Sequence, residues 1–110
     1  MKKPFYFDPY ATGTAVFLGP TEARLMELAW RKESLTVKKA LLFSDEEGQK
    51  AYTTVMTVLA RLAEKGLLQR RKEGRGFVYE PAIDRKTFLE ERVGIVSNCL
   101  RKNFKDISRR

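Results

Sequence analysis

The clearest hydrophobic pattern in the chain is in the segment AYTTVMTVLARLAEKG. Its apolar residues Val55, Leu59 and Leu62 recur at positions i, i+4 and i+7, the spacing that places side chains on one face of an α-helix. A cation in the last turn and Gly66 just after it suit the end of a helix. The pattern predicts an amphipathic helix from about Ala51 to Lys65.

The side chains on the opposite face of this central helix are short, and few of them are charged. This face presents small hydroxyl groups, one cation and a thioether, from Thr53, Thr54, Thr57, Arg61 and Met56. An exposed helix face is normally rich in charged residues, and threonine is a mediocre helix former. Such a face can lie against base edges in a DNA major groove. Taken alone, it is equally compatible with threonines tolerated on an ordinary surface.

Two shorter helices are expected before the central one. The first has Thr21 as its N-cap and continues to Arg31 or Lys32, and the second runs from Val37 to about Phe43 with Thr36 as its cap. Trp30 is expected in the hydrophobic core. An acidic loop over residues 44–49 follows, and its consecutive carboxylates lack the spacing of a metal-binding loop.

After the central helix the pattern changes from helical to extended. The segments Leu67–Lys72 and Phe77–Pro81 are rich in strand-forming residues and flank the turn Glu73–Gly76. Two such segments around a short glycine-containing turn predict a β-hairpin. The hairpin is strongly basic, with Arg75 near its tip and further cations at Arg70, Arg71 and Lys72.

A last helix is predicted from about Arg85 to Lys102, with Asp84 as its cap. Its apolar residues recur at helical spacing and need burial: Phe88, Leu89, Val93, Val96 and Leu100. A second copy of the chain can bury them, and we expect a homodimer interface here. The alternative is that this helix covers its own domain.

The first 17 residues are rich in aromatic side chains, namely Phe5, Tyr6, Phe7, Tyr10 and Phe17. A disordered tail would have fewer of them. We therefore expect the segment to pack on its own domain or on a partner subunit. An arm that reaches toward DNA is the alternative, although only Lys2 and Lys3 could meet phosphates there.

The basic residues are distributed unevenly along the chain. The chain has 110 residues, enough for one domain, and a formal net charge of +8. Residues 1–50 hold 8 Lys and Arg against 7 Asp and Glu, whereas residues 51–110 hold 14 against 7. Because the basic excess is concentrated in and after the central helix, the distribution favours a polyanionic partner.

Several classes of protein are disfavoured by what the sequence lacks. It contains no histidine and a single cysteine, Cys99, which removes the commonest general base, the commonest zinc ligand and any intrachain disulfide. No glycine-rich phosphate loop is present either, so we expect no enzyme, cofactor, metal site or small-molecule ligand. Without a long apolar run, no membrane span is expected, and the natural setting is a reducing cytoplasm.

Helix, helix, central helix and basic hairpin is the order of a winged helix-turn-helix. The predicted fold class is therefore mainly α with a small β-hairpin, divided into an aromatic N-terminal arm (residues 1–17), a winged-helix DNA-binding domain (18–82), and a C-terminal dimerisation helix with a basic tail (83–110). In such a unit the third helix enters the major groove and the hairpin, or wing, lies along the backbone.

The candidate contacts divide into two kinds on this basis. On the central helix, threonine hydroxyls can meet bases or phosphates, the methyl of Thr57 can meet a thymine methyl, and Arg61 lies one turn further along the same face. On the wing, Arg71, Lys72 and Arg75 would contact phosphates, which position a protein without reading sequence.

The same residues resemble those of the penicillinase-repressor (BlaI/MecI/CopY) family. LGPTE followed by LMELAW is similar to the family's first helix, AYTTVMT with LARL and EKGLL is similar to its recognition helix, and RRKEGR with FVY is similar to its wing. The resemblance covers about residues 18–95. It implies a dimeric winged-helix repressor whose C-terminal helices form the dimer, with DNA contacts from Thr53, Thr54, Thr57 and Arg61. Met56 stands where some members carry a basic residue.

The departures from the family concern the signal that such a repressor answers. Its copper-responsive branch uses a C-terminal cluster of cysteines, whereas this chain has Cys99 alone. Its β-lactam-responsive branch is cleaved within the dimerisation region, and Asn103-Phe104 resembles the cleaved dipeptide. The expected function is a sequence-specific regulator of double-stranded DNA, a repressor that binds a palindromic operator as a homodimer. The alternative is a winged-helix module that binds proteins without specific DNA binding.

Overall fold

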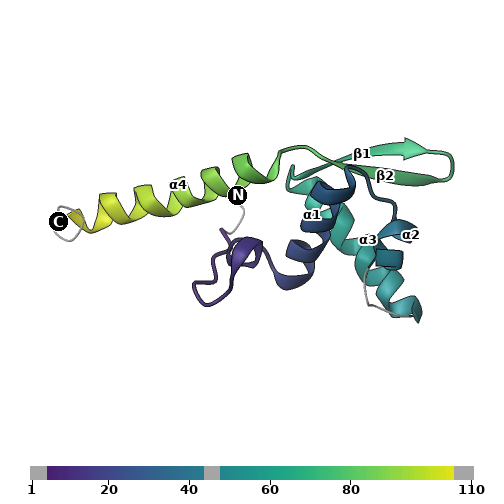
Figure 1. The fold of residues 1–110 in the computed structure, drawn as a ribbon, viewed down its shortest axis with the longest axis horizontal. Coiled ribbons are helices and arrows are strands. Elements are labelled where there is room, and N and C mark those ends of the chain that lie inside the picture. The colour runs from purple at the N-terminus through teal and green to yellow at the C-terminus, as the bar shows by residue number, and fades with distance from the viewer. Residues whose placement is uncertain (1–4, 44–47, 106–110) are drawn as a thin grey trace.

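The computed structural model of the protein describes residues 5–43 and 48–105. Its elements are, in chain order, a short 3-10 helix η1 (Gly13–Val16), helices α1 (Pro20–Lys32), α2 (Val37–Phe43) and α3 (Gly48–Glu64), strands β1 (Leu68–Glu73) and β2 (Gly76–Pro81), and helix α4 (Arg85–Asn103). The two strands form one antiparallel hairpin (Figure 1). The predicted fold class, a winged helix-turn-helix followed by a C-terminal helix, is confirmed.

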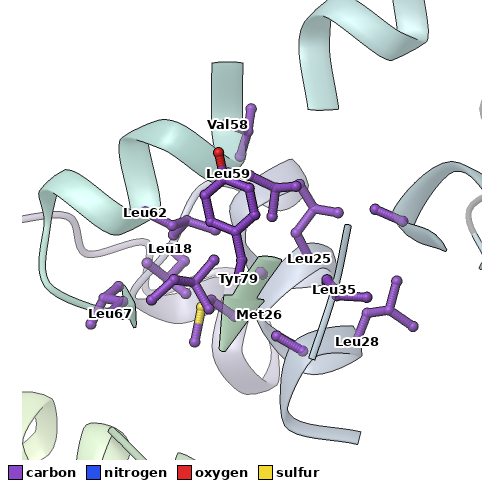
Figure 2. Close-up of a cluster of buried hydrophobic side chains, with 14 of the residues drawn as sticks. Leu18, Leu25, Met26, Leu28, Leu35, Val58, Leu59, Leu62, Leu67 and Tyr79 are labelled. Atoms are coloured by element: carbon purple, nitrogen blue, oxygen red, sulfur yellow. The ribbon is translucent and has the colours of Figure 1, made fainter. Parts of the chain in front are cut away.

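The hydrophobic core forms where α1, α3 and the hairpin meet. Leu25 and Met26 of α1 pack with Leu59 and Leu62 of α3, and Tyr79 of β2 lies among them (Figure 2). Burying large aliphatic and aromatic side chains is the main source of stability in a domain of this size. The hairpin is therefore attached to α3 through the same core.

A β-bridge adds to this attachment. The amide of Leu35, between α1 and α2, donates to the carbonyl of Tyr79 at 2.8 Å, and the amide of Tyr79 donates back to the carbonyl of Leu35 at 2.7 Å. Leu35 is fully buried. The hairpin is thus held on its outer edge by the loop that precedes α2.

The ends of the first two helices differ in how well they were predicted. The α1 helix begins at Pro20 with Gly19 as its N-cap, so the prediction of Thr21 as the cap is wrong. Proline is favoured at the first helical position because its φ is already helical and its missing N–H would be unsatisfied there. For α2 the prediction is confirmed, since Thr36 Oγ1 accepts a hydrogen bond from the amide of Lys39 at 3.1 Å.

Helix α3, the predicted central helix, begins at Gly48, three residues before its predicted start. Its end has the hydrogen bonds of a Schellman motif: the amide of Leu67 donates to the carbonyl of Leu62 and that of Gly66 to Ala63, both at 3.0 Å. Gly66 has a φ of +80°, which confirms the predicted C′ glycine. The acidic residues 44–47 of the predicted loop lie outside the described residues.

The hairpin turn is tighter than its sequence suggested. Glu73 pairs with Gly76, so only Gly74 and Arg75 form the loop. Gly74 has a φ of +60° while Arg75 does not have a positive φ, the combination of a type II′ turn. Such turns match the right-handed twist of the strands, which places Arg75 at the tip of the wing.

Helix α4 is anchored to the domain at its first turns and then projects away from it (Figure 1). Asp84 caps it by accepting a hydrogen bond from the amide of Thr87 at 2.9 Å, as predicted. Phe88 is fully buried and lies 5.8 Å from the ring of Trp30, whose indole N–H donates to the carbonyl of Ile83 at 2.9 Å. The radius of gyration is 16.2 Å, above the roughly 13 Å of a compact chain of this length, because α4 extends outward.

The N-terminal segment packs against the domain through its last residues. Phe17 is part of the core, and Thr14 is buried with its hydroxyl donating to Glu27 of α1. Further upstream, the amide of Asp8 donates to the carbonyl of Val16 at 2.8 Å, which folds the segment back on itself. This agrees with the expectation that the aromatic residues hold the segment to the protein.

Candidate nucleic-acid interface

The solvent face of α3 has the composition that the sequence indicated. All four residues proposed for DNA contact on this helix are exposed, whereas the residues on its other side are buried in the core. Thr53, Thr57 and Arg61 follow one another at four-residue spacing and form a line about 12 Å long, with Thr54 beside it. The structure therefore brings these four residues together on one surface.

Two larger side chains border this line. Tyr52 and Met56 lie four residues apart on α3 and are both partly exposed. The sequence assigns no role to either side chain. On a helical wheel Met56 lies between Tyr52 and Thr53, so helical spacing already places both side chains beside the line of threonines. The face combines hydroxyl groups with an aromatic ring and a thioether rather than with carboxylates.

The basic residues of the wing are divided between its two faces. Successive side chains of a strand point to opposite faces of the sheet, so Arg71 and Lys72 face away from each other. The structure therefore does not bring these two predicted phosphate contacts together on one face. Arg75 is separate again, at the tip.

Arg71 is engaged within the protein. Its guanidinium lies 2.6 Å from Glu73 Oε2 on the same strand and 3.4 Å from Glu80 Oε1 on β2. Hydrogen bonds to the side chains of Glu73 and then Glu80 raise the pKa of Arg71 above its usual value. A phosphate that binds Arg71 must compete with two carboxylates.

The other face of the wing carries a cation that sequence reasoning left out of the site. Arg70 shares this face with Lys72, and its guanidinium lies 4.5 Å from the centre of the Phe77 ring. Stacking on an aromatic ring holds an arginine without neutralising it. Within residues 5–43 and 48–105, neither Lys72 nor Arg75 forms an ion pair. Alternation along β1 was the signal that could have grouped Arg70 with Lys72.

Two further cations, both on α1, lie near the exposed face of α3 that carries Thr54. A cavity of about 820 Å³ lies between η1, α1 and the beginning of α3, and Arg24, Arg31 and Thr54 are among its lining residues. Both arginines are exposed and lie seven residues apart, on one side of α1. Arg24 and Arg31 therefore bring positive charge near Thr54, and one carboxylate, that of Glu27, lines the same cavity.

The predicted dimer residues of α4 differ in their surroundings. Phe88 is fully buried among Trp30 and the core of its own domain, so it does not belong to a surface that a second chain could meet. Leu89 and Val96 are partly buried at the edge of the core, whereas Val93 and Leu100 are about half exposed. Four of the five residues thus remain candidates for the interface.

Two expectations about other sites can be compared with the described part of the chain. None of its helices is both long and apolar enough to cross a membrane. Over the same residues, no three histidine, cysteine, aspartate or glutamate side chains gather as metal ligands.

Comparisons with known proteins agree with this geometry. A family model described as penicillinase repressor matches residues 18–107. The penicillinase repressor of Bacillus licheniformis is 32% identical over 73 residues, which cover 66% of this chain and 57% of that protein. The transcriptional regulator BlaI of Mycobacterium tuberculosis is 39% identical over 69 residues, which cover 62% of this chain and 50% of that protein. The chain thus spans about half the length of the curated relatives it matches.

Proposed function

The chain belongs to the penicillinase-repressor family, and on that premise we propose that it is a sequence-specific transcriptional repressor that binds a palindromic operator in double-stranded DNA as a homodimer. One observation carries the proposal: the exposed line of hydroxyl groups and one arginine on α3, next to a basic wing. Relatives named as a penicillinase repressor and as a transcriptional regulator support the same conclusion.

The reading surface is the exposed side of α3. Thr53, Thr54 and Thr57 are short enough to let the helix approach base edges closely, and each can donate or accept a hydrogen bond. The Thr57 methyl group can also pack on a thymine methyl. Arg61, at the far end, can bind guanine in bidentate fashion or a phosphate.

The wing and α1 supply sequence-independent affinity. Lys72 and Arg75 carry charge that the described part of the chain does not neutralise, and Arg70 lies on the same wing face as Lys72. Arg71 contributes less because it exchanges its contacts with Glu73 and Glu80 for a phosphate. Each phosphate contact releases counterions, so affinity falls steeply with salt.

A homodimer follows from what one such unit can read. A single winged helix covers only a few base pairs, and two copies related by a two-fold axis read two half-sites about one helical turn apart. The exposed apolar residues of α4, on the part of the helix that projects from the domain, offer the surface for that pairing.

Selection of bound sequences from a random duplex pool tests this function. We expect an inverted repeat with a fixed half-site spacing, and affinity that falls steeply as salt is raised. Equal affinity for selected and random duplexes at every salt concentration would contradict it. Absence of duplex binding at low salt, together with a stable complex with another protein, would instead favour the interaction module.

A further inference from the structure

The N-terminal segment forms a cluster of three aromatic side chains, one of which contacts α4. Phe5 and Phe7 pack around the buried ring of Phe17, with ring centres 6.2 and 5.9 Å apart from it. Arg92 of α4 reaches over the same group, with its guanidinium 5.7 Å from the ring of Phe5 and 4.9 Å from that of Phe88. The contact between Phe5 and Arg92 places this part of the segment beside the first half of α4.

These contacts leave much aromatic surface in solvent. Phe5, Tyr6 and Phe7 are 40%, 41% and 46% exposed, and we refer to these three side chains as the aromatic ledge. Further along, Val93 and Leu100 of α4 and Phe104, its C-cap residue, are 55%, 51% and 52% exposed. Their spacing of seven and four residues places them on one side of the helix, and we refer to them as the outer stripe.

The ledge and the stripe adjoin each other. Leu89 and Val96 lie on the same helix between the Arg92 side and the outer stripe, and both are partly buried against the core cluster. Phe5 of the ledge meets α4 at Arg92, on one side of this partly covered band, and the outer stripe lies on the other side. Together the ledge and the stripe expose six large apolar side chains near one another. Single exposed hydrophobic residues are normal on a protein surface, whereas a group of this size is typical of an interaction site.

We propose that the aromatic ledge and the outer stripe form a single docking surface for α4 of a second copy of this chain. The inference rests on the homodimer proposed above and adds the N-terminal segment to its interface. The outer stripe alone has three side chains, whereas a stable interface buries about 800 Å² and 20–30 residues on each partner. The ledge doubles the number of large exposed apolar side chains at this surface, and it does so with aromatic residues, the type most enriched in interface centres.

The shape of the molecule favours a second copy as the occupant. A two-fold interface must use the same surface on both chains. Each chain has a projecting helix and an aromatic ledge at its base, so the helix of either copy can lie against the ledge of the other. Because residues 1–17 precede the family match at residues 18–107, the ledge is an addition to the family's matched region.

Sedimentation velocity of the full chain over a range of concentrations tests the proposal. We expect Phe7→Ser and Val93→Ser each to raise the dimer dissociation constant at least tenfold. Tyr6→Ser is the second ledge variant, in case Phe7→Ser disturbs the packing on Phe17, and it should raise the constant at least threefold. Tyr10→Ser is the matched control, because Tyr10 belongs to the same segment but is 94% exposed. It should leave the constant within twofold.

The outcomes separate the two levels of inference. If Val93→Ser weakens the dimer but both ledge variants, folded by circular dichroism, associate as tightly as the parent, the ledge is outside the interface and this proposal is wrong. If the parent chain stays monomeric at concentrations where it binds the selected DNA, the homodimer of the proposed function is wrong as well. If Tyr10→Ser weakens the dimer as much as Tyr6→Ser, a surface confined to the ledge is also contradicted.

Discussion

Lys65 Nζ lies 2.7 Å from Glu22 Oε2 and joins the residue that directly follows α3 to the first turn of α1. The Glu22 side chain is only 10% exposed, whereas that of Lys65 is 34% exposed. Glu22 also accepts a hydrogen bond from the amide of Gly19, at 3.4 Å. One carboxylate thus closes the start of α1 and fixes the end of the reading helix.

Glu22→Gln should therefore destabilise the domain. The amide keeps the shape of the side chain but removes the charge that Lys65 faces, and we expect a loss of about 1–2 kcal/mol after allowing for the solvent access of Lys65. Urea unfolding followed by circular dichroism measures it. Arg71→Gln is the matched control, because both partners of each of its ion pairs are exposed, and it should leave the midpoint unchanged. Equal effects of the two substitutions would argue against a structural role for the Glu22 pair.

The sequence predicted those features that depend on neighbours along the chain. The buried side of α3 follows from the i, i+4, i+7 spacing of Val55, Leu59 and Leu62, and the cap at Asp84 follows from residue type and position. Contacts between distant segments were not accessible in this way. The pairing of Arg71 with Glu80 depends on the strand register, which was not predicted from the sequence.

In the candidate site, too, local spacing was predictable from the sequence and packing between distant segments was not. A helical period groups Thr53, Thr57 and Arg61, so the reading face was predictable. The period of α4 is equally regular, yet its apolar positions serve two different purposes, because Phe88 enters the core while Val93 stays exposed. Periodicity reports that a residue is on an apolar face, and only the three-dimensional packing says what covers that face.

Gly66→Ala should destabilise the protein by about 1 kcal/mol. Gly66 has a φ of +80°, and although a Cβ would meet nothing within 4 Å, a residue with a side chain is strained in that region. Gly94→Ala is the opposite case, since Gly94 lies inside α4 in open space, without a positive φ. There alanine should stabilise the helix by about 0.5–1 kcal/mol. Thermal unfolding of both variants tests the pair, and a shift of the same sign in both would contradict the assignment.

On the wing, Lys72→Ala should reduce DNA affinity more than Arg71→Ala. Arg71 is already paired with Glu73 and Glu80, whereas within the described residues Lys72 has no carboxylate partner. Removing one phosphate contact lowers the slope of log affinity against log salt by about 0.9. We expect that change for Lys72→Ala and a smaller one for Arg71→Ala. Fluorescence anisotropy with the selected duplex at several salt concentrations measures both slopes. A larger effect of Arg71→Ala than of Lys72→Ala would contradict the view that Arg71 is held by its two carboxylate partners.

On the reading helix, substitutions of Thr57 should change which sequence is bound. Thr57→Val keeps the methyl group and removes the hydroxyl, whereas Thr57→Ser does the opposite. If the methyl group packs on thymine, only Thr57→Ser should relax the preference at one base pair of each half-site, by about 0.8 kcal/mol, the transfer free energy of one buried methyl group. Repeating the duplex selection with each variant tests this. Arg75→Ala serves as the control, because a phosphate contact weakens all sequences alike.

The stability of the α4 anchor should depend on pH through Asp84. Hydrogen bonds from the side chain and the backbone of Thr87 lower the pKa of the Asp84 carboxyl in the folded protein. A depressed folded pKa means that the ionised cap stabilises the protein above the unfolded pKa of about 3.9 and that this contribution is lost as pH falls through the folded value. Asp84→Asn keeps a side-chain oxygen that can cap the helix but does not titrate. The difference in melting temperature between parent and variant should therefore be constant from about pH 7 to 5 and shift in favour of the variant below about pH 4. Because every other carboxyl is shared by the two proteins, melting curves that stay parallel down to acid pH would show that Asp84 is not the group responsible.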